Sequence, residues 1–226
     1  MHKVMRLRHL GIIHLLCGLL LLGCICQGQA PTNPRSKKKA AKTSAAPTTK
    51  FLALPIGGQF ILPECDKRTV PPPMYAPGLP AWCWQDSSGT PRSVAPEPAP
   101  ANDTLLIHIP PAEAPIYIVN LALTAKIENK GLQAVIFHTN GVRAIDDVME
   151  ALTSMYGKPT HQAPVTVENN VGVEFTSQNA QWQFTNLSVE YRGVDSELSV
   201  GTVWIETPAE HKKRSDAEKK APAKDK

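Results

Sequence analysis

The sequence predicts an α+β fold in which one helix packs on one face of an antiparallel sheet. Three observations predict this class. Two extended segments in residues 116–138 flank a turn, a single amphipathic helix follows them, and short apolar segments separated by polar turns then continue to residue 207. A hairpin, a helix and a meander in this order are typical of an antiparallel sheet that buries one face.

The predicted hairpin joins Ile116–Glu128 to Leu132–His138 through the turn sequence Asn129-Lys130-Gly131. A shorter strand, Leu105–Ile109, precedes it. That strand must end at Pro110, because proline has no backbone N–H to donate to a sheet.

The helix is predicted from about Val142 to Tyr156. Asp146 and Asp147 lie near its N-terminus, where the helix dipole favours acids. Gly157 is placed to cap the C-terminus, and the proline two residues later prevents the helix from continuing. The apolar residues of its inner face recur at three- and four-residue steps: Ile145, Val148, Met149, Leu152, Met155 and Tyr156.

Short apolar or alternating segments after the helix predict an antiparallel meander of three to five strands. This meander completes an α+β domain over residues 104–207. The predicted segments are Val165–Val167, Val171–Phe175, Ala180–Phe184, Leu187–Tyr191 and Leu198–Ile205.

Residues 51–103 predict a small Pro-rich N-terminal lobe, because their eleven prolines forbid long helices and central strands. In an oxidising compartment, Cys65 and Cys83 are expected to form a disulfide that staples this lobe. It would close a loop of 17 intervening residues and contribute about 3 kcal/mol. Two free thiols or two zinc ligands are the alternatives. A zinc site requires four ligands, and no other Cys or His lies near either residue.

Residues 1–28 predict a signal peptide, in which a short basic start precedes an apolar run over Gly11–Leu22. The run is shorter than the roughly 20 residues of a bilayer span, which favours a cleaved signal over a permanent anchor. Leu21, Gly23 and Cys24 resemble the motif of bacterial lipoprotein signals, which would leave Cys24 lipidated. Cleavage after Gly28 is the alternative. The protein is therefore expected to be exported, as a periplasmic, outer-membrane-anchored or secreted protein.

The charge of the chain is divided between its parts. Residues 51–210 carry 8 basic and 17 acidic side chains, although the whole chain has a net charge of +4. The excess of basic residues lies outside this range, including in a disordered basic linker predicted over residues 29–50 and a disordered basic tail over 208–226. These segments are either solvated spacers or electrostatic tethers to anionic lipid or envelope polymers. The acidic body, and the lack of aromatic residues in the tails, argue against nucleic acid.

Three sequence features resemble uncharacterised secreted proteins of bacteria. They are the phrase Leu62-Pro63-Glu64-Cys65, the helix ending Tyr156-Gly157-Lys158-Pro159-Thr160, and Trp182 with a last strand that closes on Thr207. The resemblance spans roughly residues 51–207. It implies a location in the cell envelope and no particular activity.

No catalytic set, metal site or cofactor motif is predicted. The sequence lacks a nucleophile elbow, a His pair at ligand spacing and a Gly-rich phosphate loop before a helix. His108 and His138 are expected within strands as packed or surface residues, and His161 stands alone. Asp146, Asp147 and Glu150 are expected to form a solvated helix start.

A candidate partner-binding surface comprises Tyr75, Trp82 and Trp84, which surround Cys83 among prolines. Such flat amphipathic side chains recognise peptides or sugars, although they could instead pack the lobe onto the sheet. The sequence therefore favours a non-catalytic interaction module whose partner is a protein or glycan of the envelope. An envelope hydrolase with a site assembled by the fold, and a structural accessory subunit, are the alternatives.

Overall fold

The structure is a computed structural model, and it describes residues 49–65, 79, 81–86, 98–169, 171–195 and 197–221. The chain divides into Met1–Ser44 and Ala45–Lys226, and every described residue belongs to the second unit. The predicted signal peptide, Cys24 and Tyr75 lie outside the described residues.

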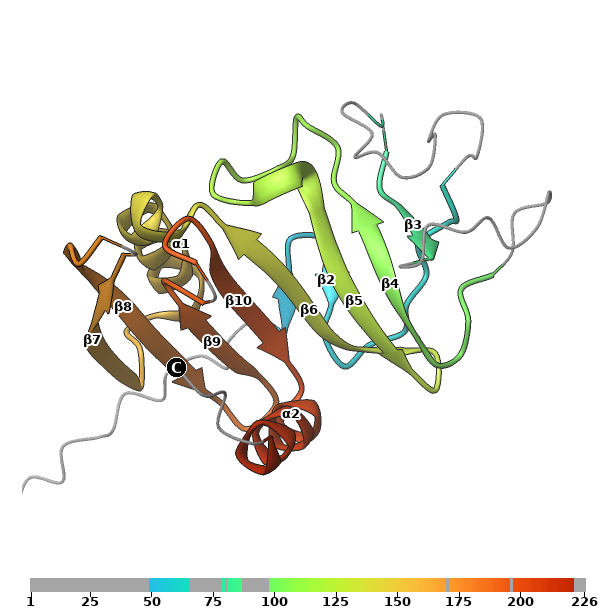
Figure 1. Cartoon of the computed structure of the whole chain (residues 1–226). Coiled ribbons are helices and arrows are strands. Elements are labelled where there is room, and N and C mark those ends of the chain that lie inside the picture. Colours follow the sequence, from blue (N-terminus) through green and yellow to red (C-terminus); the bar gives the residue numbers. More distant parts are fainter. Residues whose placement is uncertain are drawn as a thin grey trace, which may run out of the picture. The chain divides into compact units, whose positions relative to one another are not determined.

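The described residues form one eight-stranded sheet in which every neighbouring pair of strands is antiparallel (Figure 1). Its strands lie in the order β3-β4-β5-β6-β10-β9-β8-β7. They are β3 (Cys83–Asp86), β4 (Asp103–His108), β5 (Ala122–Glu128), β6 (Gly131–Thr139), β7 (His161–Glu168), β8 (Glu174–Gln183), β9 (Ser188–Arg192) and β10 (Gly201–Glu206).

The connections follow the predicted order. β5 and β6 form the hairpin, the chain then crosses through α1 (Ile145–Tyr156) to the far edge, and β7–β10 return strand by strand until β10 pairs with β6. Within the meander, the segment after the β7–β8 turn differs from prediction. Residues 174–183 form the single strand β8 rather than parts of two strands, because Ser177 and Asn179 keep register with Val165 and Ala163 of β7.

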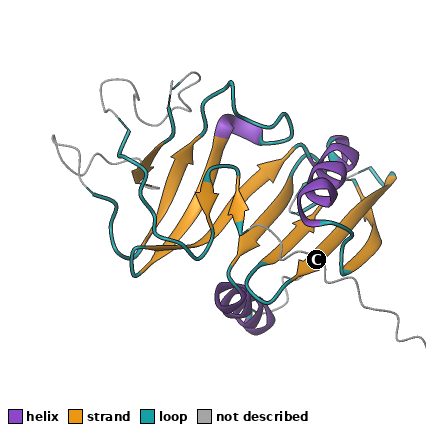
Figure 2. Cartoon of the chain, turned by 180° about the vertical axis from the view of Figure 1, so that it is seen from behind, coloured by secondary structure: helices purple, strands orange, loops and turns teal. Residues whose placement is uncertain are grey.

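The core lies on one face of this sheet. Val203 and Ile205 of β10 are buried there with their register partners on β6 and β9. The short pair β1 (Lys50–Phe51) and β2 (Leu54–Pro55) covers part of this face, where Phe51 stacks on Phe137 with ring centroids 5.1 Å apart (Figure 2). The residues that alternate with these point to the opposite, polar face.

α1 packs on the core face through Val148, Leu152 and Tyr156, as its periodicity predicts. It starts at Ile145 rather than Val142, because Gly141–Arg143 form a separate 3-10 turn, η2. Gly141 has a φ of 52°, and a Cβ there would lie 2.0 Å from the Leu198 carbonyl oxygen. Only glycine fits this close approach. A second 3-10 turn, η1 (Val119–Leu121), precedes β5 where a continuous strand from Ile116 is expected.

The described parts of residues 51–103, where the sequence predicts a small stapled lobe, contribute to the main sheet and core. β3 adds a strand to β4, and Phe51, Leu54 and Trp84 belong to the common core. The predicted disulfide between Cys65 and Cys83 is present. Among the described residues, β3 pairs with β4 on one side, and on the other the Trp84 backbone bonds to Pro63 and Cys65. The backbone of β3 is thus satisfied from both sides.

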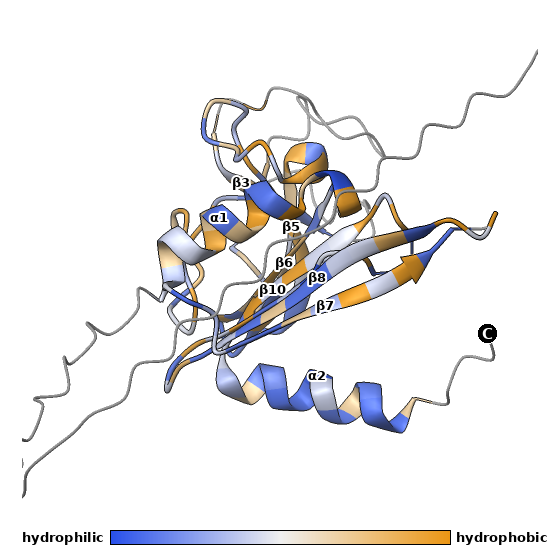
Figure 3. Cartoon of the chain, turned by 90° about the vertical axis from the view of Figure 1, so that its left-hand side faces the viewer, coloured by the Kyte–Doolittle hydropathy of each residue, from blue (hydrophilic) through white to orange (hydrophobic). Residues whose placement is uncertain are grey.

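The prediction of a wholly disordered tail is wrong for Pro208–Lys220, which form a second helix, α2. The side chain of Thr207 accepts a hydrogen bond from the Glu210 N–H, and Pro208 occupies the first turn. Thr207 and Glu210 have the Ser/Thr-x-x-Glu spacing of a capping box, a helix-start signal present in the sequence. Figure 3 shows α2 on the opposite face of the sheet from α1, and mostly hydrophilic along its length.

Candidate functional site

The β7–β8 hairpin and the loop of residues 193–200 form a pocket at one end of the sheet. β8 pairs with β9 over Asn179–Gln183, whereas its pairing with β7 continues to Glu174. The hairpin therefore projects past β9. The loop runs alongside this projection, and the Gly193 N–H donates to the Gln178 carbonyl at 2.8 Å.

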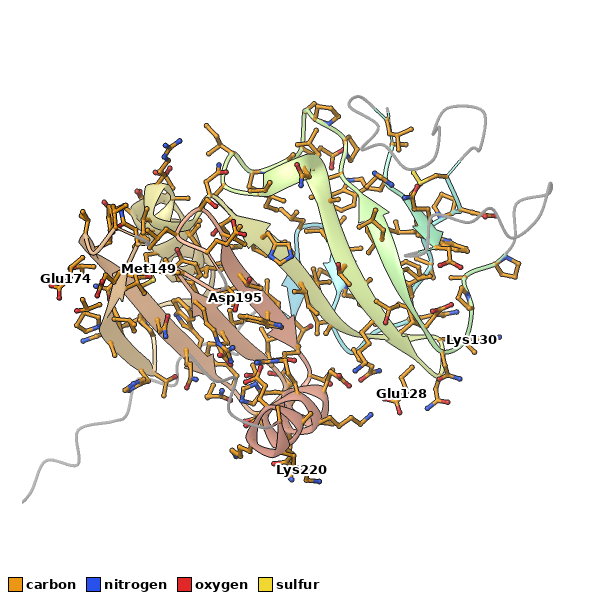
Figure 4. The ribbon with its side chains drawn as sticks, in the orientation of Figure 1. Glu128, Lys130, Met149, Glu174, Asp195 and Lys220 are labelled. Carbon is orange, nitrogen blue, oxygen red and sulfur yellow. A yellow bond between two sulfur atoms is a disulfide. The ribbon has the colours of Figure 1, made fainter. Side chains whose placement is uncertain are left out.

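The pocket has a volume of about 920 Å³ and an acidic wall. Two carboxylates come from the hairpin and two from the loop, and all four are exposed. Glu174 and Asp195 are labelled in Figure 4. None of the ten lining residues is basic. The acidic residues are Glu168, Glu174, Asp195 and Glu197.

Two of these acids repel one another. Glu168 and Glu174 are direct cross-strand partners in the β7–β8 ladder. Like charges directly opposite each other destabilise a sheet, so a bound cation would relieve this repulsion. The pair marks the pocket as a place where a positive group is favoured.

A smaller apolar recess adjoins the acidic pocket. It has a volume of about 360 Å³ and shares Leu198 and Ser199 with the pocket. Its remaining lining residues are Asn140, Val142, Arg143 and Phe175, so one basic side chain borders it. Together the pocket offers a subsite for a positive group and the recess a subsite for an apolar group, at one end of the sheet.

The turn of the hairpin presents apolar residues beside the acids. Val171 is 82% exposed and Val173 is 49% exposed. The Asn169 side chain accepts hydrogen bonds from the N–H groups of both, which fixes the turn. The exposed valines are therefore held in place rather than on a free loop.

A hydrogen-bonded chain attaches the pocket loop to the sheet. Thr202 Oγ1 donates to Asp195 Oδ2 at 2.9 Å, and His138 Nδ1 lies 3.2 Å from the same Oγ1. In a catalytic triad the histidine lies between the hydroxyl and the carboxylate. Here the hydroxyl lies between them and Thr202 is buried, so the chain positions the loop and does not activate a nucleophile.

Trp82 and Trp84, the two described residues of the predicted aromatic surface, lie in different surroundings. Trp84 is 1% exposed and lies in the core, which agrees with the alternative that these aromatic residues pack onto the sheet. Its register partner Ile107 holds it on the buried face of the sheet. Trp82 is half-buried, and its Nε1 donates to Glu113 Oε2 at 2.8 Å. Tyr75, as noted, is outside the described residues.

The histidines and the helix-start aspartates named from the sequence lie outside the pocket. His108 is buried in β4, where it is the register partner of Cys83 on β3. This burial lowers the pKa of His108. His161 is exposed at the start of β7. Asp146 and Asp147 occupy the exposed first turn of α1, in agreement with their prediction as a solvated helix start.

No described helix is long and apolar enough to cross a membrane. Within the described ranges, no three His, Cys, Asp or Glu residues are grouped as ligands for a metal ion. Comparison of the chain with protein-family models, with curated proteins and with solved structures finds no match.

Proposed function

We propose that this protein is a non-catalytic interaction module of the cell envelope, and that it binds a protein segment carrying a Lys or Arg next to an apolar side chain. The observation that carries the proposal is the acidic pocket joined to an apolar recess. The cationic group would lie against Glu168 and Glu174, and the apolar group beside Phe175 and Leu198.

The exposure of the pocket's carboxylates favours binding over hydrolysis. A carboxyl group that acts as a general acid is usually buried in apolar surroundings, which keep it protonated. Glu168, Glu174, Asp195 and Glu197 are all open to solvent. They suit the attraction of a cation better than proton transfer.

The exposed valines favour a protein partner over a glycan. Val171 and Val173 add apolar contact area next to the acids, and apolar area is the main source of protein–protein affinity. The other route to a protein partner, addition of a strand at the edge, is opposed by Pro164 in β7. A proline in an edge strand lacks the outward N–H that a new strand would need.

The envelope location rests on the predicted signal peptide of residues 1–28 and is supported by the Cys65–Cys83 disulfide, which suits an oxidising compartment. Lipidation at Cys24 and cleavage after Gly28 predict different N-termini, and the intact mass of the mature protein distinguishes them. We also propose that the Pro-rich stretch between the two cysteines forms the stapled loop and the basic residues of 29–50 the tether.

Binding to an immobilised peptide array tests the function. The peptides combine zero, one or two Lys or Arg residues with and without a neighbouring Leu, on an otherwise constant Gly/Ser background. We expect binding to require both side-chain types and to weaken about tenfold in Glu174→Gln. That factor corresponds to about 1.4 kcal/mol, as for one charge-assisted contact.

Glu150→Gln is the matched control, because it removes the same charge from an exposed position on α1. Equal weakening by both variants would mean that only net charge matters, which would overturn the pocket as the site. Turnover of an envelope polymer that is lost in Glu174→Gln would support the hydrolase instead.

A further inference from the structure

α2 lies on the polar face of the sheet and is attached there by polar contacts. Its apolar residues Pro208, Ala209 and Ala217 are exposed. The contacts are made by its charged side chains with acids and bases of β5, β9 and β10. A helix that is polar on all sides buries no apolar face against the sheet, so such pairs are what attaches it.

The central contact is Arg214, whose guanidinium meets two carboxylates of the sheet. Its Nη2 lies 2.6 Å from Glu206 Oε1 and 2.7 Å from Glu190 Oε2. Glu206 is 1% exposed. The guanidinium carbon also lies 4.7 Å from the centre of the Trp204 ring, within the range of a cation–π contact.

The sheet residues of this contact are positioned by strand alternation. Trp204 and Glu206 are two residues apart on β10, and Glu190 is the register partner of Trp204 on β9. All three therefore point to the same face. They are carried by β9 and β10, whose other faces are in the core.

An indole face beside two carboxylates has the chemistry of a guanidinium site. Arginine stacks on aromatic rings and donates several hydrogen bonds in a fixed plane, whereas the lysine ammonium is a compact point charge. A second arginine, Arg192, also lies 4.7 Å from the Trp204 ring and donates to Glu190 at 2.7 Å. The ring is therefore already a contact surface for guanidinium groups.

We propose that Trp204, Glu190 and Glu206 form a guanidinium-binding site, that Arg214 fills it in the free protein, and that an arginine of a partner protein replaces Arg214. α2 is then a displaceable cover over this part of the polar face. The site is separate from the acidic pocket and does not depend on the function proposed for that pocket.

The first test adds small cations to the full-length Arg214→Ala variant. Methylguanidinium is the probe and methylammonium the matched cation, and the indole N–H signal of Trp204 is followed by NMR. We expect saturable binding of methylguanidinium at least tenfold tighter than of methylammonium. Arg143→Ala, which removes an exposed arginine of η2, is the control and should show no such preference.

The second test uses the wild-type chain, so that it does not depend on the folding of a variant. The hydrogen exchange of the α2 amides is followed at constant NaCl concentration, with the α1 amides as the reference. A peptide with a single Arg should release α2 at lower concentration than its Lys counterpart. Equal effects of the two peptides or of the two small cations would overturn the proposal.

Discussion

The two helices of this protein lie on opposite faces of one sheet and are attached by different forces. α1 buries Val148, Leu152 and Tyr156 against the core face. α2 is of similar length, but it contacts the polar face through ion pairs, centred on Arg214. The first attachment depends on apolar area removed from water. The second depends on charge pairs, and salt screens the exposed ones more than the buried Arg214–Glu206 pair.

The apolar contacts of α1 stabilise the fold, whereas the ion pairs of α2 can respond to changes in the surroundings. Apolar packing changes little with ionic strength, so α1 and the core should hold the fold together over a wide range of conditions. Ion pairs respond to salt, to pH and to competing charges. The face that carries α2 is therefore the part of the molecule best suited to change when a partner binds.

The largest expected effect is on the α1 side. Leu152→Ala should lower the free energy of unfolding by about 2–5 kcal/mol, because it removes a fully buried side chain and leaves a cavity. Urea denaturation at low and high salt measures the loss, which should be the same in both. A loss that shrinks with salt would show that α1 also depends on charge. Glu150→Ala, on the exposed side of α1, is the control.

Alkaline pH should also weaken the α1 side. Burial raises the pKa of Tyr191 to about 12 from 10.0. The unfolded chain therefore loses this proton first, so the contribution of Tyr191 is complete below pH 10 and is lost as pH rises toward 12. Denaturation at pH 8 and pH 11 should show a decline that is smaller in Tyr191→Phe. An unchanged decline in that variant would assign the effect to other groups, such as Tyr156, whose pKa burial also raises.

Acid should instead release α2. Burial alone would raise the pKa of Glu218, but hydrogen bonds from Arg192 and Arg214 hold it below its ordinary value of 4.5. A depressed carboxyl pKa contributes stability above the ordinary value, and this is lost as pH falls through the folded value. Hydrogen exchange between pH 6 and pH 3 should show α2 losing protection before α1. Simultaneous loss would mean that the two faces unfold together.

The smallest effect is expected on the outer side of α2. Lys212 pairs with Asp216 at i,i+4, and its side chain is 77% exposed. Exposed pairs of this kind contribute about 0.3–0.5 kcal/mol. Lys212→Ala should therefore change the hydrogen exchange of α2 little, and much less than Arg214→Ala. A comparable effect would show that α2 depends on its own helicity more than on its contacts with the sheet.

Local patterns predicted most of the sheet and all of α1. The apolar spacing of Val148 and Leu152 predicts α1 from residues within one helix. The Asn129-Lys130-Gly131 sequence likewise predicts the turn between β5 and β6. α2 was missed because it lacks an apolar face. Its partners Glu190 and Glu206 lie 24 and 8 residues before Arg214, and no periodicity within 208–220 points to them. The Thr207–Glu210 capping spacing was the one signal that could have located its start.

The candidate site was the least predictable part. Glu168 and Glu174 become neighbours through the hairpin register, and Asp195 and Glu197 join them because the loop lies beside β8. For Trp84 the sequence leaves two interpretations open, a surface contact or packing onto the sheet. The structure has Trp84 in the core, paired with Ile107 of the neighbouring strand. Whether an aromatic residue is a contact or a core residue depends on which side of its strand meets the sheet's buried face.

The sequence by itself determined the antiparallel α+β architecture, the place of α1 and the pairing of Cys65 with Cys83. Each depends on spacing within a short segment or, for the cysteines, on the single pair that remains once the predicted signal peptide is set aside. Only the tertiary structure decided that 51–65 and β3 join the main core, that acids gather at the β7–β8 hairpin, and that α2 lies over Trp204. Charge–charge contacts between distant segments have no sequence period, because any acid and any base can pair once the fold brings them together.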